Sequence, residues 1–273
     1  MQGKKVTAPR LAKMKGKTRI VMVTAYDYPT ARLVDEAGVD AILVGDSLGM
    51  VVLGMDTTRT VTLEDMERHT AAVARARPRA LLVADMPFGS YEPSTSKAVE
   101  SAIRLARAGA EAVKLEGGEE YADRIRAIVH AGIPVMGHIG LTPQRSLRLG
   151  GYKLQGKTQS AAEQLLRDAK ALEEAGVFAI VIEFTSPDTA KRITESVSVP
   201  TICIGSGPHC DGQVLVLHDL LGLTPEPPPF AKRYVDLSSI IKRAVQEYAR
   251  EVREGLFPGP EHTPHKKNKQ APG

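Results

Sequence analysis

The sequence predicts an α/β fold, a (β/α)8 TIM barrel with an N-terminal extension and a C-terminal helix and tail. Three observations carry this prediction. The chain has 273 residues, which is long for an ordinary domain but normal for one barrel of this kind. One short pattern recurs along the chain, and seven or eight apolar runs alternate with stretches of helical character.

The recurring pattern is a helix that ends in Ala-Gly, followed by an apolar strand that ends in a polar residue. Glycine is favoured just past a helix because it adopts the left-handed conformation easily. The pattern occurs as DEAG at 35–38, RAG at 107–109, HAG at 130–132 and EAG at 174–176. Repetition of such a βα unit favours a parallel barrel or a doubly wound sheet, and the number of units favours the barrel.

Taken in order, the apolar runs predict eight strands, of which the last is the least regular. They lie at residues 20–25, 41–45, 80–84, 112–115, 135–138, 179–182, 201–204 and 214–218. Helices are predicted in the gaps, at residues 29–37, 63–75, 94–108, 119–131, 161–175, 187–196 and 237–254.

We therefore expect a single domain over residues 1–273, with the barrel at about 19–222, a C-terminal helix at about 237–254 and a flexible tail at about 263–273. Two connections are unusually long, 48–62 and 140–159. Both follow predicted strands, on the face where the active sites of such barrels lie.

Composition argues against several function classes. The formal net charge is +4, but much of this excess lies in the tail around 265–269, and the chain has no Trp and only 4% aromatic residues. A nucleic-acid site is therefore not expected. The sequence has no 18-residue apolar run and no apolar signal core near its start, so we expect a cytoplasmic protein.

The chain has two cysteines, Cys203 and Cys210. Their spacing matches no zinc or redox motif, and the expectation is that both serve as small buried residues.

Polar residues end or directly follow five successive predicted strands: Asp46, Asp85, Glu116, His138 and Glu183. Each alone has an ordinary explanation, such as a helix cap, a turn or a hydrogen-bonded core histidine. In a barrel, however, the carboxyl ends of the strands converge on one cavity. Five coincident positions therefore predict a polar site at that end.

The three acids of the second to fourth strands, Asp46, Asp85 and Glu116, suit a hard divalent cation, Mg²⁺ first. Lys114 shares the interior face with Glu116 because side chains alternate along a strand. It is either a structural counter-ion for Glu116 or, as we favour, a partner for a substrate carboxylate beside the metal. Glu183 emerges from a wholly apolar strand, so burial should raise its pKa.

Several longer motifs identify a resemblance to the ketopantoate hydroxymethyltransferase family, covering nearly the whole chain. They are TAYD (24–27), VGDSLGM (44–50), ADMPF (84–88), VKLEGG (113–118), GHIGLTPQ (137–144), GGYKLQG (150–156), DGQVLV (211–216) and FPGPEH (257–262). Two loops depart from the family pattern: Ser186-Pro187 replaces a proline three residues after Glu183, and CIGSG at 203–207 replaces Gly-Ile-Gly-Ala-Gly.

The resemblance implies one Mg²⁺ per subunit and transfer of a hydroxymethyl group from 5,10-methylenetetrahydrofolate to 3-methyl-2-oxobutanoate, giving 2-dehydropantoate on the route to pantothenate and coenzyme A. It also implies a homo-oligomer, typically a decamer. By motif position Asp46, Asp85 and Glu116 correspond to the metal-site acids and Glu183 to the general base. Residues expected to bind the ketoacid are Asp46, Ser47, Asp85, Lys114 and His138.

Two other interpretations remain at this stage. The chain could be a Mg²⁺-dependent aldol lyase or mutase of the phosphoenolpyruvate/pyruvate type, because those enzymes also enolise a metal-bound 2-oxoacid. A barrel that serves only as a binding or scaffold subunit is the other interpretation. Presence of every acid together with Lys114 argues against the scaffold.

Overall fold

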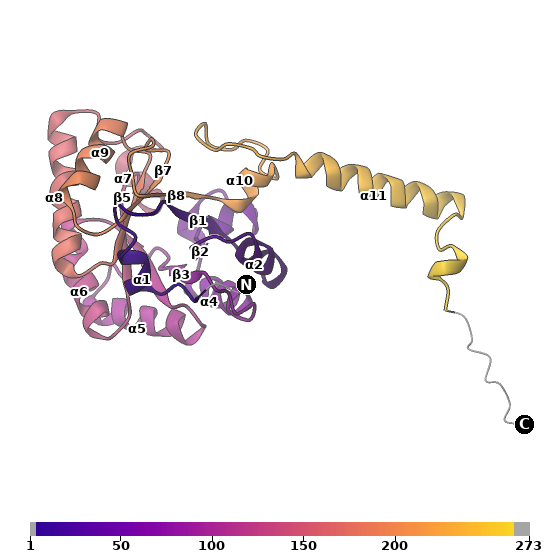
Figure 1. Ribbon diagram of the computed structural model, residues 1–273, viewed down its shortest axis with the longest axis horizontal. Helices are drawn as coiled ribbons and strands as arrows, with labels where there is room; N and C mark the ends of the chain where they lie inside the picture. Colours follow the sequence, from indigo (N-terminus) through magenta and orange to yellow (C-terminus); the bar gives the residue numbers. More distant parts are fainter. Residues whose placement is uncertain (1–3, 265–273) are drawn as a thin grey trace, which may run out of the picture. The chain divides into compact units, whose positions relative to one another are not determined.

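The computed structural model describes residues 4–264 and contains the predicted closed, all-parallel barrel (Figure 1). Each strand pairs with its neighbours in sequence, and the last strand pairs with the first. The strands are β1 (Ile20–Thr24), β2 (Ala41–Val44), β3 (Leu81–Asp85), β4 (Ala112–Glu116), β5 (Val135–Gly140), β6 (Ala179–Glu183), β7 (Thr201–Ile204) and β8 (Gly212–Leu215).

Helices lie in the connections between successive strands from β1 to β7, with one further helix before β1 and two after β8 (Figure 1). They are α1 (Ala8–Ala12), α2 (Tyr28–Glu36), α3 (Leu48–Val51), α4 (Leu63–Ala74), α5 (Thr95–Arg107), α6 (Ala122–His130), α7 (Ser146–Leu149), α8 (Gln159–Ala175), α9 (Pro187–Ser196), α10 (Leu217–Leu221) and α11 (Leu237–Glu254), with 3-10 turns η1 (Thr58–Thr60), η2 (Glu119–Tyr121), η3 (Pro143–Arg145) and η4 (Pro260–His262). The glycines of the repeated pattern, Gly38, Gly109, Gly132 and Gly176, all have positive φ, from 89° to 112°.

The barrel interior is a continuous apolar core built from alternate residues of the strands. All eight strands contribute to it, for example β1 through Ile20 and Met22 and β3 through Leu81 and Val83. Val6 and two residues of α1 join the same cluster, so the N-terminal extension packs against the core. At the carboxyl ends of the strands the side chains that face the barrel interior change from apolar to polar.

Three element predictions need correction. β8 begins at Gly212, two residues before the predicted start, because Gly212 lies so close to the Ile20 carbonyl that a Cβ would sit 2.5 Å from it. A strand start without a side chain gives no hydrophobic signal. The predicted helix 119–131 is divided into η2 and α6, and the two long connections contain the short helices α3 and α7.

The chain divides into two compact units. The first holds residues up to Leu217 together with Pro228–Ala231, and the second holds His218–Pro227 and the residues from Lys232 onward. α11 spans the predicted residues and is capped at its start by Asp236, whose side chain accepts a hydrogen bond from the Ser239 amide. The predicted tail, 263–273, lies outside the described residues except for 263 and 264. None of the helices between residues 4 and 264 is both long and apolar enough to cross a membrane.

Candidate active site

The predicted acids of the second and third strands lie together at the carboxyl end of the barrel. Asp85 is the last residue of β3, and Asp46 follows β2 by two residues. The backbone N–H of Asp46 donates to Asp85 Oδ2 at 3.0 Å. Both side chains are buried, so the two carboxylates are held side by side away from solvent.

Lys114 extends inside the barrel into this group of acids. Its ammonium lies 2.8 Å from Asp85 Oδ1, and both side chains are about 5% exposed or less. Burial opposes the charge on Lys114, but the carboxylates of Asp85, Glu116 and Asp46 outweigh it and raise the lysine pKa. Lys114 therefore stays an ammonium ion, and its ion pair is with Asp85 rather than with Glu116.

Glu116 ends β4 and is also buried. Its Oε2 accepts a hydrogen bond from the backbone N–H of Gln144 at 3.1 Å, and the Gln144 side chain donates to Asp46 Oδ2 at 2.8 Å. Burial raises the Glu116 pKa well above its ordinary value, and the neighbouring Asp46 adds to that effect. For Asp46, burial and then Asp85 raise the pKa to about 7.

His138 links the acids to Glu183, on the other side of the mouth. Its Nδ1 lies 3.2 Å from Lys114 Nζ, and its Nε2 lies 3.2 Å from Glu183 Oε2. Burial, with Lys114 adding to it, lowers the His138 pKa well below its ordinary value, so the ring is neutral. Because the ammonium donates to Nδ1, the ring hydrogen is on Nε2, the nitrogen nearer to Glu183.

Glu183 is the last residue of β6 and is less enclosed than the acids, with 17% of its side chain exposed. Burial among apolar residues raises its pKa to about 7, and Lys114 opposes the shift. Glu183 is also not a structural residue of the ordinary kinds, a helix cap or a partner of a lysine in the long loop after β5. The N-cap of α9 is Ser186, and among the described residues Glu183 forms no ion pair with Lys153 or Lys157.

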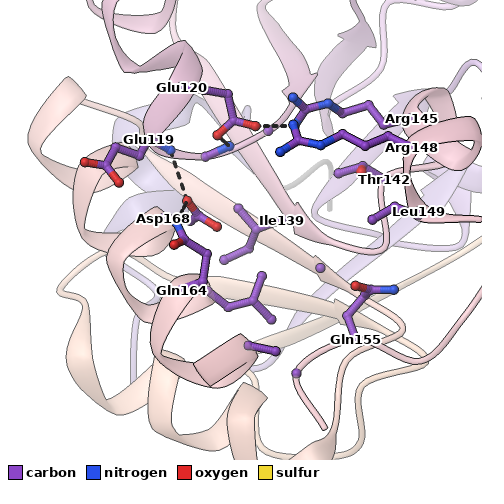
Figure 2. Close-up of a pocket in the computed structure, with 16 residues that line it drawn as sticks. Glu119, Glu120, Ile139, Thr142, Arg145, Arg148, Leu149, Gln155, Gln164 and Asp168 are labelled. Carbon is purple, nitrogen blue, oxygen red and sulfur yellow. Dashed lines mark hydrogen bonds and ion pairs between the residues drawn. The ribbon is translucent and has the colours of Figure 1, made fainter. Parts of the chain in front are cut away.

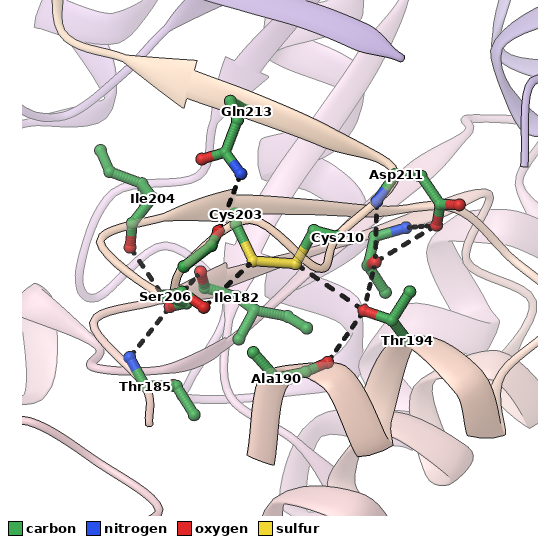
Figure 3. Close-up of a disulfide and its surroundings, with 12 residues drawn as sticks. Ile182, Thr185, Ala190, Thr194, Cys203, Ile204, Ser206, Cys210, Asp211 and Gln213 are labelled. Carbon is green, nitrogen blue, oxygen red and sulfur yellow. Dashed lines mark hydrogen bonds between the residues drawn. A yellow bond between two sulfur atoms is a disulfide. The ribbon is translucent and has the colours of Figure 1, made fainter. Parts of the chain in front are cut away.

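The backbone around Glu183 is held by the loop after β7. Ser206 Oγ donates to the Ile182 carbonyl and accepts from the Thr185 amide, each at 2.9 Å (Figure 3). Cys203 and Cys210, at the two ends of this loop, form a disulfide. Both cysteines are fully buried, but they are bonded to each other, so the expectation that they serve simply as small residues is wrong. Their spacing gave no signal, because the Cα atoms come within 5.7 Å only when the loop turns back.

Two residues in the site were not recognised from the sequence. Tyr26 lies with its hydroxyl 2.8 Å from the Oγ of Ser47, a predicted substrate ligand. Gln144 contacts two of the acids, as described above, although it is distant from both in sequence. Tyr26 lies in the motif TAYD and Gln144 in the motif GHIGLTPQ, and this membership was the sequence signal that could have identified them.

The donor set fits Mg²⁺ on charge and ligand type. Three buried carboxyl groups lie around one buried ammonium, so the site offers more oxygen ligands than its own cation uses. Within the described part of the chain no three His, Cys, Asp or Glu side chains surround a common point. Mg²⁺ commonly binds through one or two carboxylates and keeps several waters, so this arrangement still accommodates it.

A separate pocket of about 600 Å³ lies between α8 and the connection that follows β5 (Figure 2). Gln164 and Asp168 project into it from α8, and Arg145 and Arg148 lie across from them. Asp168 Oδ1 accepts a hydrogen bond from the Glu119 amide at 3.2 Å. The lining includes none of the predicted site residues.

Among solved structures, the chain resembles phosphonopyruvate hydrolase in complex with oxalate and Mg²⁺, with a TM-score of 0.62, 18% identity, and coverage of 97% of this chain and 93% of that one. It also resembles 2,3-dimethylmalate lyase, with a TM-score of 0.60, 21% identity and coverage of 95% and 92%. At these identities the likeness shows the fold alone.

Sequence relatives are much closer to this chain. It is 66% identical to the 3-methyl-2-oxobutanoate hydroxymethyltransferase of Aeropyrum pernix, over 98% of this chain and 97% of the relative. It is 71% identical to the enzyme of the same name from Hyperthermus butylicus, over 91% and 86%. A family model described as ketopantoate hydroxymethyltransferase matches residues 5–260. The chain belongs to the ketopantoate hydroxymethyltransferase family.

Proposed function

We propose that this protein transfers a hydroxymethyl group from 5,10-methylenetetrahydrofolate to 3-methyl-2-oxobutanoate, giving 2-dehydropantoate for the synthesis of pantothenate and coenzyme A. Family membership supports the reaction. The observation that carries the mechanism is that the mouth of the barrel has two different sides. One side holds a fixed group of ionisable side chains, namely Asp46, Asp85, Glu116 and Lys114. The other side holds the carboxyl group of Glu183, which is close to half protonated at neutral pH.

The acids would hold one Mg²⁺ per subunit, Asp46 and Asp85 most directly and Glu116 directly or through water. When bound, the ion stabilises negative charge on the keto oxygen of the substrate. The ketoacid carboxylate would lie against Lys114, whose ammonium supplies a charge-assisted hydrogen bond. Ser47, oriented by the Tyr26 hydroxyl, and His138 complete the proposed substrate contacts.

Glu183 would be the general base that removes the C3 proton of the ketoacid. A base is most effective when its pKa lies near the working pH, and the apolar strand raises the Glu183 pKa to about 7. The neutral His138 ring, with Nε2 3.2 Å from Glu183 Oε2, lies beside the carboxylate and limits its position. The resulting enolate would form a C–C bond to the methylene carbon of the folate, and water would supply the hydroxyl group as both C–N bonds of that carbon break. Tetrahydrofolate would leave, its two nitrogens taking up the proton from C3 and one proton from water.

Product analysis tests the reaction directly. Purified protein with Mg²⁺, 3-methyl-2-oxobutanoate and 5,10-methylenetetrahydrofolate should form 2-dehydropantoate, detected by proton NMR, with no product when folate is left out. Cleavage of a hydroxyacid with release of pyruvate or glyoxylate, independent of folate, would instead establish the lyase function.

We also propose a homo-oligomer, with a decamer as the expected size from the family. α11 supports this proposal because none of its residues is buried, so its apolar side chains are open to solvent. Among them are Ile241, Val245 and Tyr248, which are 46–59% exposed. Exposed apolar side chains at this spacing are typical of a face that another chain covers. Light scattering should give a mass many times the 29.4 kDa of one chain, and a monomer would contradict the proposal.

A further inference from the structure

Gln144 is buried at the centre of the acid group, although it comes from the connection after β5 rather than from a strand end. It lies in η3, directly after Pro143, and is 2% exposed. Its side-chain amide contacts groups that follow β2 and β3, and its backbone contacts the last residue of β4. One residue therefore connects three strands that carry the acids.

The hydrogen bonds of the amide allow one orientation. Nε2 lies 2.8 Å from Asp46 Oδ2 and 3.0 Å from the Met86 carbonyl, and both of these partners are acceptors. Oε1 lies 2.9 Å from the Tyr91 hydroxyl, which donates to it. A reversed amide would place its oxygen against two other oxygens. Tyr91 is fully buried, so its hydroxyl holds the amide in this orientation.

The backbone of the same residue holds a second acid. The Gln144 N–H donates to Glu116 Oε2 at 3.1 Å. The Tyr91 hydroxyl also lies 3.1 Å from the Glu116 carbonyl. Asp46 is thus held by the side chain of Gln144 and Glu116 by its main chain, so a side-chain substitution releases Asp46 alone.

We propose that Gln144 is a positioning residue that fixes Asp46 relative to Glu116 for cation binding, with Tyr91 orienting its amide. This inference rests on the proposed Mg²⁺ site. Two carboxylates buried close together repel each other, and N–H donors behind them keep their free oxygens aimed at a common ion. Loss of such a partner typically costs about 10–100-fold in metal affinity or activity.

The test is a titration of the full-length protein with Mn²⁺ alone, followed by electron paramagnetic resonance. Gln144→Met keeps the length of the side chain but removes both amide groups, and should weaken Mn²⁺ binding by about 10–100-fold. Tyr91→Phe removes one neutral hydrogen bond and should weaken binding by about threefold to tenfold. The matched control is Gln164→Met, because Gln164 also donates to a carboxylate, Asp168, outside the acid group. It should bind Mn²⁺ like the wild type.

Thermal unfolding of the metal-free proteins separates positioning from packing. A purely structural glutamine would lower the melting temperature and leave Mn²⁺ affinity unchanged, and that result for Gln144→Met and Tyr91→Phe overturns the inference. If Gln144→Met does not fold, Tyr91→Phe decides alone. If the wild type itself binds no Mn²⁺, the metal site of the proposed function is wrong. Binding by the wild type with equal binding by both variants rejects only the role of Gln144.

Discussion

The two sides of the barrel mouth are built in different ways. On the side of β2, β3 and β4, the acids and Lys114 are buried and held by ion pairs, backbone amides and Gln144. On the side of β6, Glu183 is partly exposed, and its nearest polar neighbour described above is the uncharged His138 ring, with Nε2 3.2 Å from Glu183 Oε2. The first side is a rigid group of charges. The second presents one carboxylate against an apolar strand.

This difference corresponds to two chemical tasks. A site that binds a cation and an anionic substrate gains from charges that are fixed in advance, because little reorganisation is then needed on binding. A general base needs a pKa near the working pH, which burial among Ile and Val residues provides for Glu183. Changes on the first side should therefore abolish binding, and changes on the second should slow proton transfer.

The largest expected effect is that of Asp85→Ala on the first side. Asp85 accepts from the Asp46 amide and pairs with Lys114, so its loss removes a proposed metal ligand and frees a buried cation. We expect ketoacid binding and activity to fall to background while the barrel stays folded by circular dichroism. Full activity in the variant, or in the wild type with excess chelator, would contradict the metal site.

Lys114→Ala separates substrate binding from metal binding on the same side. Loss of a charge-assisted hydrogen bond should weaken ketoacid binding by about 10–100-fold. Mg²⁺ affinity should be kept or should rise, since Lys114 no longer competes for Asp85. Calorimetry measures both affinities. Unchanged ketoacid affinity with lowered thermal stability alone would make Lys114 a structural counter-ion.

A pH profile examines the second side. The titratable groups around Glu183 include His138 of β5, which is neutral, and Lys114 of β4, which stays charged. Asp46, Glu116 and Tyr152 are also close enough for the Glu183 charge to raise their pKa values, that of Asp46 to about 7 with burial as the main cause. Glu183 works as a base only when deprotonated, and its pKa is raised to about 7. The rate of C3 proton removal should therefore rise about tenfold per pH unit below 7 and level off above it. A flat profile from pH 5 to 8 would exclude Glu183.

The smallest effect is expected from Cys203→Ser, in the loop that supports β6. Opening this short covalent loop should cost about 2–3 kcal/mol of unfolding free energy in the loop-entropy model. Because Ser206 then loses some of its hold on the end of β6, proton removal should slow modestly while Mg²⁺ affinity is unchanged. The check is thermal unfolding of the variant, and of the wild type with and without a reducing agent. A melting temperature that changes neither on substitution nor on reduction would contradict the prediction.

Most of the fold could be predicted from the sequence because its signals are local. The Ala-Gly helix ends and the apolar runs depend on neighbouring residues only, and β7 and α9 match their predicted bounds. Prediction failed where the determinant is distant. The start of β8 is set by the approach of Gly212 to Ile20, far away in the chain.

The same reason explains what was missed in the site. The proximity of strand ends such as Asp85 and Glu116 could be predicted, because barrel topology alone makes them converge. Gln144 could not, since its position depends on how the connection after β5 folds back over the mouth, and the sequence gives no periodic signal for that. The disulfide is a second case of chain reversal.

The central proposal is that fixed charges hold the ketoacid while Glu183 removes its C3 proton. The most direct measurement is proton NMR of 3-methyl-2-oxobutanoate in D2O with protein and Mg²⁺, without folate. The C3 proton should exchange for deuterium with the wild type, and Glu183→Gln should slow the exchange by about 10²–10⁴-fold while Mg²⁺ and ketoacid still bind. Exchange at the wild-type rate in Glu183→Gln would contradict the claim and make His138 the first candidate for the base.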